Sequence, residues 1–223
     1  MKEIYLYHGS ACKIQTPEYG FGNLYNDFGR GFYCTKDIEL AKEWASGENL
    51  SGYVNKYKID LNNLKILNLF DEKYNILHWL ALLLNYRSFN PKSAIAKKGK
   101  DYLLNNYLID INKYDLIIGY RADDSYFTFA KDFLNNIINI KQLDAAMKLG
   151  DLKEQYVLIS KKSFTKIKFI SSEKVDNTIY YKKRKMRDDN ARNNYYELQN
   201  SIDTNGIYIR DIITGVKIDG KSL

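Results

Sequence analysis

Cysteine, proline and histidine are scarce in this chain, which has two of each among 223 residues. Two cysteines are too few for a disulfide framework, and two histidines far apart in the sequence add no cluster of metal ligands. Pro17 and Pro91 stand alone, and no stretch is rich in glycine and serine. From this composition we expect no metal site and no flexible linker between separate domains.

Long hydrophobic runs are also missing. The longest apolar stretch, Ile76–Leu84, is interrupted by His78. The segment from Met1 to Ser10 has neither the basic beginning nor the apolar core of a signal peptide. We therefore expect no membrane contact, and the scarcity of cysteine fits a cytoplasmic location.

Basic residues outnumber acidic ones, with 34 Lys and Arg against 27 Asp and Glu and a net charge of +7. Such a charge favours an anionic ligand, a nucleic acid or an acidic protein without deciding between them. The lysines are spread along the chain except for one basic cluster, formed by Lys182, Lys183, Arg184, Lys185 and Arg187. This cluster fits either a solvated surface or a contact with nucleic acid.

Residue patterns predict strands and helices in irregular alternation. Period-two alternation and short apolar runs predict strands over residues 3–8, 31–35, 52–59, 65–69, 114–119, 155–160, 165–170 and 206–213. Apolar three-and-four spacing predicts helices over residues 36–47, 74–86, 94–108, 124–149 with a break near 139, and 182–200. Because no βαβ unit repeats, we expect an α+β fold with a mostly antiparallel sheet and flanking helices. Residues 1–171 would form one domain, on which an extension over residues 172–223 docks.

Three segments near the N-terminus carry a distinctive pattern: Leu6-Tyr7-His8-Gly9-Ser10, then Phe28-Gly29-Arg30-Gly31-Phe32-Tyr33, then a helix with Ala41 and Trp44. Over residues 4–45 the pattern resembles the NAD-binding half of the ADP-ribosyltransferase superfamily, in its poly(ADP-ribose) polymerase and diphtheria-toxin branch. Over most of its length the chain also looks like a small bacterial domain family of unknown function placed in that superfamily. Members of that family carry Asp-Phe-Gly-Arg-Gly-Phe-Tyr and a later Ala-Asp-Asp, and they lie beside antitoxin-like genes. The resemblance implies an ADP-ribosyltransferase-like split sheet that binds NAD.

The resemblance assigns roles to the residues of this pattern. His8, at a strand end, would hydrogen-bond a hydroxyl of the nicotinamide ribose, and the Gly9 backbone would pair with the nicotinamide carboxamide. Tyr33 would lie against the nicotinamide ring, and Trp44, eleven positions later, on its other face. The implied cofactor-binding set also contains Ser10, Gly31 and Arg30, the last reaching the pyrophosphate.

Each of these residues also has a purely structural interpretation. His8 could be a core or turn histidine, Tyr33 is one of 20 tyrosines, and Trp44 on an amphipathic helix could be core. Arg30 between two glycines could be a solvated loop charge. Their joint spacing is what favours the cofactor-binding interpretation.

Catalysis is where this chain departs from the superfamily. ADP-ribosyl transfer passes through an oxocarbenium-like state that a carboxylate stabilises, and the superfamily usually supplies a glutamate at the start of a late strand. Here Gln155 stands at that place. The missing charge would come from Asp123 or Asp124, one of which could instead cap the following helix, or from Glu154, which should face away from Gln155.

Three functions therefore compete. The leading expectation is an NAD-dependent ADP-ribosyltransferase that uses NAD as co-substrate and no metal, and that acts as the toxin of a bacterial toxin–antitoxin pair. Its acceptor would be a protein or a nucleic acid, and its partner a cognate antitoxin. The second is a pseudoenzyme that binds NAD or ADP-ribose, which the missing glutamate suggests. The third is a nucleic-acid-binding protein that uses the basic cluster.

Overall fold

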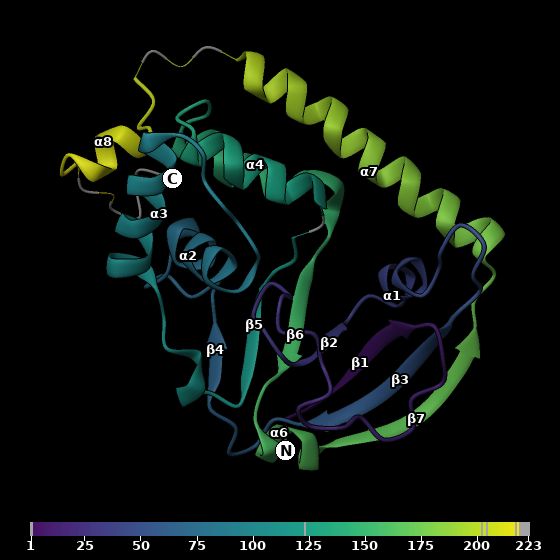
Figure 1. Ribbon diagram of the computed structural model, residues 1–223. Coiled ribbons are helices and arrows are strands. Elements are labelled where there is room, and N and C mark those ends of the chain that lie inside the picture. Colours follow the sequence, from purple (N-terminus) through teal and green to yellow (C-terminus); the bar gives the residue numbers. More distant parts are fainter. Residues whose placement is uncertain (1, 123, 202, 204, 217, 219–223) are drawn as a thin grey trace.

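The protein is built around a seven-stranded sheet with the order β4-β5-β6-β2-β1-β3-β7 (Figure 1). The computed structural model describes residues 2–122, 124–201, 203, 205–216 and 218. Neighbouring strands pair antiparallel except for β4 and β5, which are parallel. The expected α+β class with a mostly antiparallel sheet and flanking helices is confirmed. The strands are β1 Glu3–Ser10, β2 Phe32–Thr35, β3 Tyr53–Asp60, β4 Ile66–Asn68, β5 Leu116–Tyr120, β6 Glu154–Leu158 and β7 Ile167–Lys174.

The sheet is divided in its middle. β1 pairs with β3 from Glu3 to Ser10, and β2 pairs with β6 along its whole length. Between β1 and β2, by contrast, the described residues pair only at Tyr7 and Thr35. One half, β4-β5-β6-β2, therefore runs at an angle to the other half, β1-β3-β7, as Figure 1 shows.

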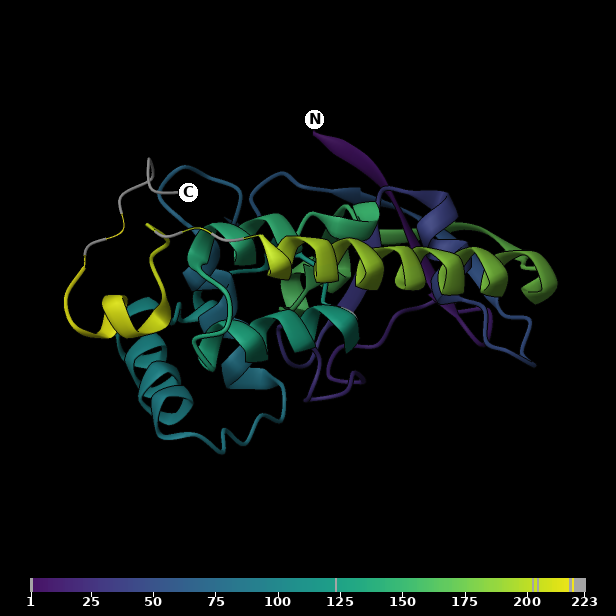
Figure 2. The ribbon, with the colours of Figure 1, turned by 90° about the horizontal axis from the view of Figure 1, so that it is seen from above.

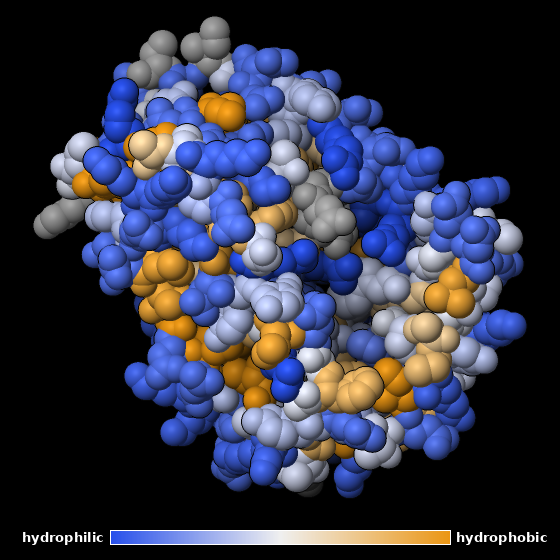
Figure 3. All heavy atoms as spheres, viewed as in Figure 1, coloured by the Kyte–Doolittle hydropathy of each residue, from blue (hydrophilic) through white to orange (hydrophobic). Residues whose placement is uncertain are grey.

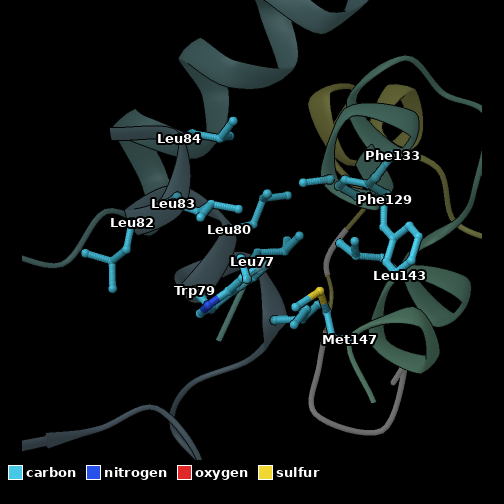
Figure 4. Close-up of a cluster of buried hydrophobic side chains, with 14 of the residues drawn as sticks. Leu77, Trp79, Leu80, Leu82, Leu83, Leu84, Phe129, Phe133, Leu143 and Met147 are labelled. Carbon is cyan, nitrogen blue, oxygen red and sulfur yellow. The ribbon is translucent and has the colours of Figure 1, made fainter. Parts of the chain in front are cut away.

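Helices α2 (Ile76–Tyr86), α3 (Ala94–Tyr107), α4 (Asp124–Leu134) and α5 (Ile140–Ala146) pack beside the first half. Leucines of α2 meet Phe129 and Phe133 of α4 together with Leu143 and Met147 in the main core (Figure 4). His78 interrupts the apolar run of α2 because it caps the helix, its Nδ1 accepting from the Asn75 backbone N–H at 3.1 Å.

Helix α1 (Ile38–Trp44) lies against β1 in the second half. Asp37 caps it by accepting hydrogen bonds from the backbone N–H groups of Glu39 and Leu40. A Cβ at Gly9 would stand 2.1 Å from the Ala41 carbonyl oxygen and 2.6 Å from the Ala45 nitrogen. Only glycine allows this helix to pack so closely on the strand.

The expected strand over residues 206–213 is wrong. This segment contains α8 (Ile209–Ile213), whose Ile209 and Ile212 are both buried. Their spacing of three fits one helix face, and the Asp211 carboxylate accepts from the Tyr208 backbone N–H at 3.0 Å, capping the helix. The sequence pattern predicts a strand here because a helix of five residues is too short to show a helical period.

Two further elements change the expected boundaries. A short helix, α6 (Lys161–Lys166), precedes β7, so β7 begins at Ile167 instead of residue 165. Helix α7 (Asn177–Asn200) starts five residues before the expected 182 and runs along one side of the molecule (Figure 2). Two single turns of 3₁₀ helix, η1 (Ile111–Lys113) and η2 (Leu149–Asp151), complete the elements. Within the described ranges, no helix is long and apolar enough to cross a membrane.

Candidate functional site

A cleft of about 860 Å³ opens where the sheet divides. It is bordered by the ends of β1 and β2, by α1, by the loop before β2, by β6 and by α7. Figure 3 shows hydrophilic side chains gathered on the face along α7. Its volume lies in the range of about 300–1,000 Å³ typical of sites for small molecules and cofactors. Six residues expected from the sequence line it: His8, Gly9, Gly31, Tyr33, Trp44 and Gln155.

His8 is fixed in one tautomer at the edge of this cleft. Its Nδ1 lies 2.6 Å from the backbone oxygen of Tyr33, and because a carbonyl only accepts, Nδ1 must carry the proton. Burial lowers the pKa of His8, although the bond to Tyr33 opposes this effect. The imidazole is therefore neutral near pH 7, and its Nε2 is free of a proton and able to accept from a hydroxyl.

Tyr33 is held by the loop that precedes its own strand. Its hydroxyl donates to the Gly29 carbonyl at 2.6 Å and accepts from the Phe28 backbone N–H at 3.1 Å. Gly29 has a φ of +69°, the left-handed conformation that favours glycine. Burial raises the pKa of Tyr33, so the ring stays a neutral phenol. This loop therefore sets the orientation of an aromatic face in the cleft.

Trp44, at the end of α1, has a cation over its ring. The guanidinium carbon of Arg121 stands 3.9 Å from the ring centroid. The resemblance implies that the nicotinamide ring lies against Trp44. In the structure the Arg121 guanidinium lies against the tryptophan ring instead. The ring is thus able to bind a flat cation, but a ligand on the same face would have to displace Arg121.

Gln155 is buried in β6 and is held through its amide group. Its Nε2 donates to the backbone oxygen of Tyr120 at 2.8 Å and to the Asp27 carboxylate at 3.1 Å. Asp27 is 5% exposed and also accepts from the Ala122 backbone N–H at 2.9 Å. Arg87 forms an ion pair with Asp27 at 2.8 Å. The glutamine is therefore positioned by a buried carboxylate that is itself neutralised by an arginine.

Sequence reasoning missed Asp27 as a site residue. It stands directly before Phe28-Gly29-Arg30-Gly31, so the motif contained a signal. Its partners, however, are 60 and 128 positions away, at Arg87 and Gln155. Nothing in the local sequence indicates that these residues meet.

Three other candidates lie outside the lining of the cleft. The Ser10 hydroxyl accepts from Asn55 Nδ2 at 3.0 Å. Arg30 is exposed, and its Nε donates to the Gly22 carbonyl at 3.1 Å. Glu154 faces away from Gln155, as expected for its strand neighbour, and forms an ion pair with Lys36 at 3.7 Å. Asp123 and the side chain of Asp124 fall outside the described residues, although α4 begins at Asp124.

The sequence model of one protein family, described as "Protein of unknown function (DUF3990)", matches residues 4–169. The chain belongs to this family. No curated protein and no solved structure matches it.

The DUF3990 match divides the cleft lining into two parts. It includes His8, Tyr33, Trp44, Asp27 and Gln155, and it ends before α7 begins at Asn177. The remaining wall therefore lies beyond the region by which the family is recognised.

That second wall includes part of the basic cluster. Arg184, Lys185 and Arg187 line the cleft, whereas Lys183 forms an ion pair with Glu39 at 3.0 Å. Part of the basic cluster therefore faces the cleft, and Lys183 instead belongs to the contact between α7 and α1. In the described part of the chain, no three His, Cys, Asp or Glu side chains gather as a metal site requires.

Proposed function

We propose that this DUF3990 protein binds NAD in the cleft and transfers its ADP-ribose to an acceptor, with release of nicotinamide. One observation carries the proposal. His8, Tyr33, Trp44 and Gln155 come from four separate elements, and all four line the same cleft. The residues whose spacing in the sequence suggests a cofactor site thus lie together in space. Residues with four unrelated structural roles would not need to meet in one cleft.

The geometry suits the nicotinamide end of NAD. The deprotonated Nε2 of His8 accepts a hydrogen bond from a ribose hydroxyl, and the Tyr33 ring offers a stacking surface for nicotinamide. Trp44 offers a second one once Arg121 moves aside. These contacts orient the bond between nicotinamide and ribose toward Gln155.

The charge of the transition state is the demanding requirement. Breaking this bond leaves positive charge on the ribose, and Gln155 offers only a neutral amide oxygen. Among the described residues, Asp27 is the carboxylate in contact with Gln155, and Arg87 offsets its charge. We infer that Asp27 positions Gln155. This arrangement is compatible with slow transfer of ADP-ribose and also with NAD binding without transfer.

The pseudoenzyme alternative is favoured by the same contact. Among the described residues, the Gln155 side chain makes its two hydrogen bonds through Nε2, which leaves its Oε1 as the group for a ligand. An amide oxygen holds a ribose hydroxyl but supplies no net charge. The proposed role as the toxin of a toxin–antitoxin pair with a macromolecular acceptor rests on the sequence resemblance.

Release of labelled nicotinamide from NAD tests the proposal. We expect release by the wild type and a loss of about a hundredfold in His8→Ala and Gln155→Ala, since each removes one preorganised contact. Glu154→Ala is the matched control for Gln155→Ala, because it changes the adjacent residue on the opposite face and should retain full activity. Asp123→Ala and Asp124→Ala test the other possible sources of charge.

Two outcomes separate the alternatives. NAD binding by calorimetry without nicotinamide release identifies the pseudoenzyme. Absence of NAD binding in the folded wild type rejects both forms of the proposal. If Glu154→Ala loses as much activity as Gln155→Ala, the assignment of the cleft as the reaction site is wrong.

A further inference from the structure

Helix α7 spans the two halves of the molecule (Figures 1 and 2). Near its start, Lys183 forms an ion pair with Glu39 of α1 at 3.0 Å, and in its middle Arg187 forms one with Glu43 of α1 at 2.7 Å. Near its end, the Tyr195 hydroxyl donates to Asp132 of α4 at 2.7 Å, and the Tyr195 ring stacks on Phe129 at 3.9 Å. The helix is therefore fixed on both sides of the cleft.

Hydrophobic burial does not explain why the helix lies there. Of its 24 residues, only Ala191 and Tyr195 are buried among those described. A helix in contact with a core normally buries a continuous apolar stripe. The middle of α7 instead turns polar and charged side chains to the cleft, and most of them share one helix face, at Tyr181, Arg184, Lys185, Asp188 and Arg192.

The α7 cations that line the cleft differ in how they are neutralised. Arg187 is paired with Glu43, and Arg192 with Asp188 at 2.9 Å. Arg184 instead reaches the Ser46 carbonyl at 3.5 Å, which is a neutral acceptor. For Lys185 the described residues offer no ion pair.

The Arg184 side chain reaches from α7 to the end of α1, which also borders the cleft. Ser46 lies two residues after Trp44, so its contact places the Arg184 guanidinium beside the end of α1. Arg121, over the Trp44 ring, is another cation of the lining. The lining also contains the carboxylates of Glu18 and Asp189. An elongated ligand with an aromatic end at Tyr33 would present its next groups to these cations.

We propose that Arg184 and Lys185 of α7 bind the diphosphate group of a dinucleotide in the cleft. This inference rests on the proposed function and deepens it, because it assigns the wall opposite the nicotinamide end. A guanidinium offers paired donors that match phosphate oxygens, and an ammonium adds a compact charge. Arg30, to which the resemblance assigns this role, is exposed and donates to the Gly22 carbonyl at 3.1 Å.

Calorimetry with fragments of the ligand tests the assignment. NAD, ADP-ribose and pyrophosphate carry the diphosphate, whereas nicotinamide alone does not. We expect Arg184→Gln and Lys185→Gln each to weaken binding of the first three by about tenfold, since each loses a charge-assisted contact. Nicotinamide binding should be unchanged in both variants.

Lys182→Gln is the matched control for Lys185→Gln. Lys182 lies on the same helix, is exposed and does not line the cleft, so its substitution removes the same charge elsewhere. Retained affinity for NAD, ADP-ribose and pyrophosphate in Lys182→Gln supports a local contact. Equal losses in Lys182→Gln and Lys185→Gln would mean a general effect of charge and would overturn the inference.

The same titrations separate this inference from the proposed function. If the wild type binds nicotinamide and NAD and both α7 variants retain full NAD affinity, the α7 assignment fails and the NAD site stands. If the wild type binds neither NAD nor nicotinamide, the proposed function fails, and the α7 inference about a dinucleotide fails with it. Pyrophosphate binding that depends on Arg184 in such a protein would show an anion site for another ligand.

Discussion

The two walls of the cleft are held by different forces. The wall within the DUF3990 match is fixed by side-chain hydrogen bonds to backbone carbonyls, as His8 and Tyr33 show, by close packing, and by the buried ion pair of Asp27 with Arg87. The α7 wall is fixed by the ion pairs of Lys183 with Glu39 and of Arg187 with Glu43 and by the hydrogen-bonded, stacked Tyr195, with little apolar burial along the helix. The first wall should therefore resist changes of salt and single substitutions away from its contacts, whereas the second should respond to both.

Two ion pairs of nearly equal burial allow a direct comparison of the walls. The side chains of Asp27 and Arg87 are 6% and 26% exposed, and those of Glu43 and Arg187 are 4% and 27% exposed. Asp27 additionally accepts from the Ala122 backbone and from Gln155, whereas the Glu43 pair joins α7 to α1.

The largest effect is expected for Asp27→Ala, which should lower the free energy of unfolding by about 3–5 kcal/mol. The substitution leaves Arg87 without its carboxylate and the Ala122 N–H without its acceptor, and it leaves the Gln155 amide only its bond to the Tyr120 carbonyl. Urea denaturation measures the loss. Asp27→Asn, which keeps the shape and an acceptor oxygen, should recover part of it.

Glu43→Ala should lower the same free energy by less, about 2 kcal/mol, because among the described residues the Glu43 carboxylate accepts only from Arg187, which keeps its bond to the Gly150 carbonyl. Amide exchange should then be faster in α7 than in β1. If Glu43→Ala and Asp27→Ala cost the same, or if α7 keeps its protection, the two walls are not held by different forces.

The next effect concerns close packing in the first wall. Gly9→Ala should lower the free energy of unfolding by about 2 kcal/mol, since the new methyl group would stand 2.1 Å from the Ala41 oxygen. Gly47→Ala is the control, because its Cβ would meet only the Leu50 Cβ at 3.4 Å. Equal denaturation midpoints for the two variants would contradict the close approach of α1 and β1.

Most of the sheet could be predicted from the sequence, but the assembly of the cleft could not. The alternating residues of β1 and the three-and-four spacing of α1 are local signals. Short stretches of sequence are therefore enough to predict these elements and their order. The Asp27–Arg87–Gln155 network joins three distant segments, and no local pattern encodes such a meeting. Helix α8 was missed for another reason, since a helix of five residues is too short to show a helical period.

The smallest effect is a pH dependence that arises in the first wall. Burial lowers the pKa of His8 below its ordinary value of 6.5. In the unfolded chain His8 takes up a proton as the pH falls through about 6.5, whereas in the folded protein it does so only at a lower pH, so the unfolded state binds more protons between the two. Stability supplied by neutral His8 is therefore complete above pH 6.5 and is lost as the pH falls below it.

Urea denaturation at pH 7 and pH 5.5 measures this effect, which should be about 1 kcal/mol for one histidine. His78 also has a pKa lowered by burial, so the wild type contains two such contributions. His8→Gln should remove only one of them and reduce the loss between the two pH values without abolishing it. An unchanged pH dependence in His8→Gln would mean that His8 is solvated in the cleft. The wall that carries the proposed nicotinamide contact would then be less rigid than the bond of His8 to the Tyr33 carbonyl indicates.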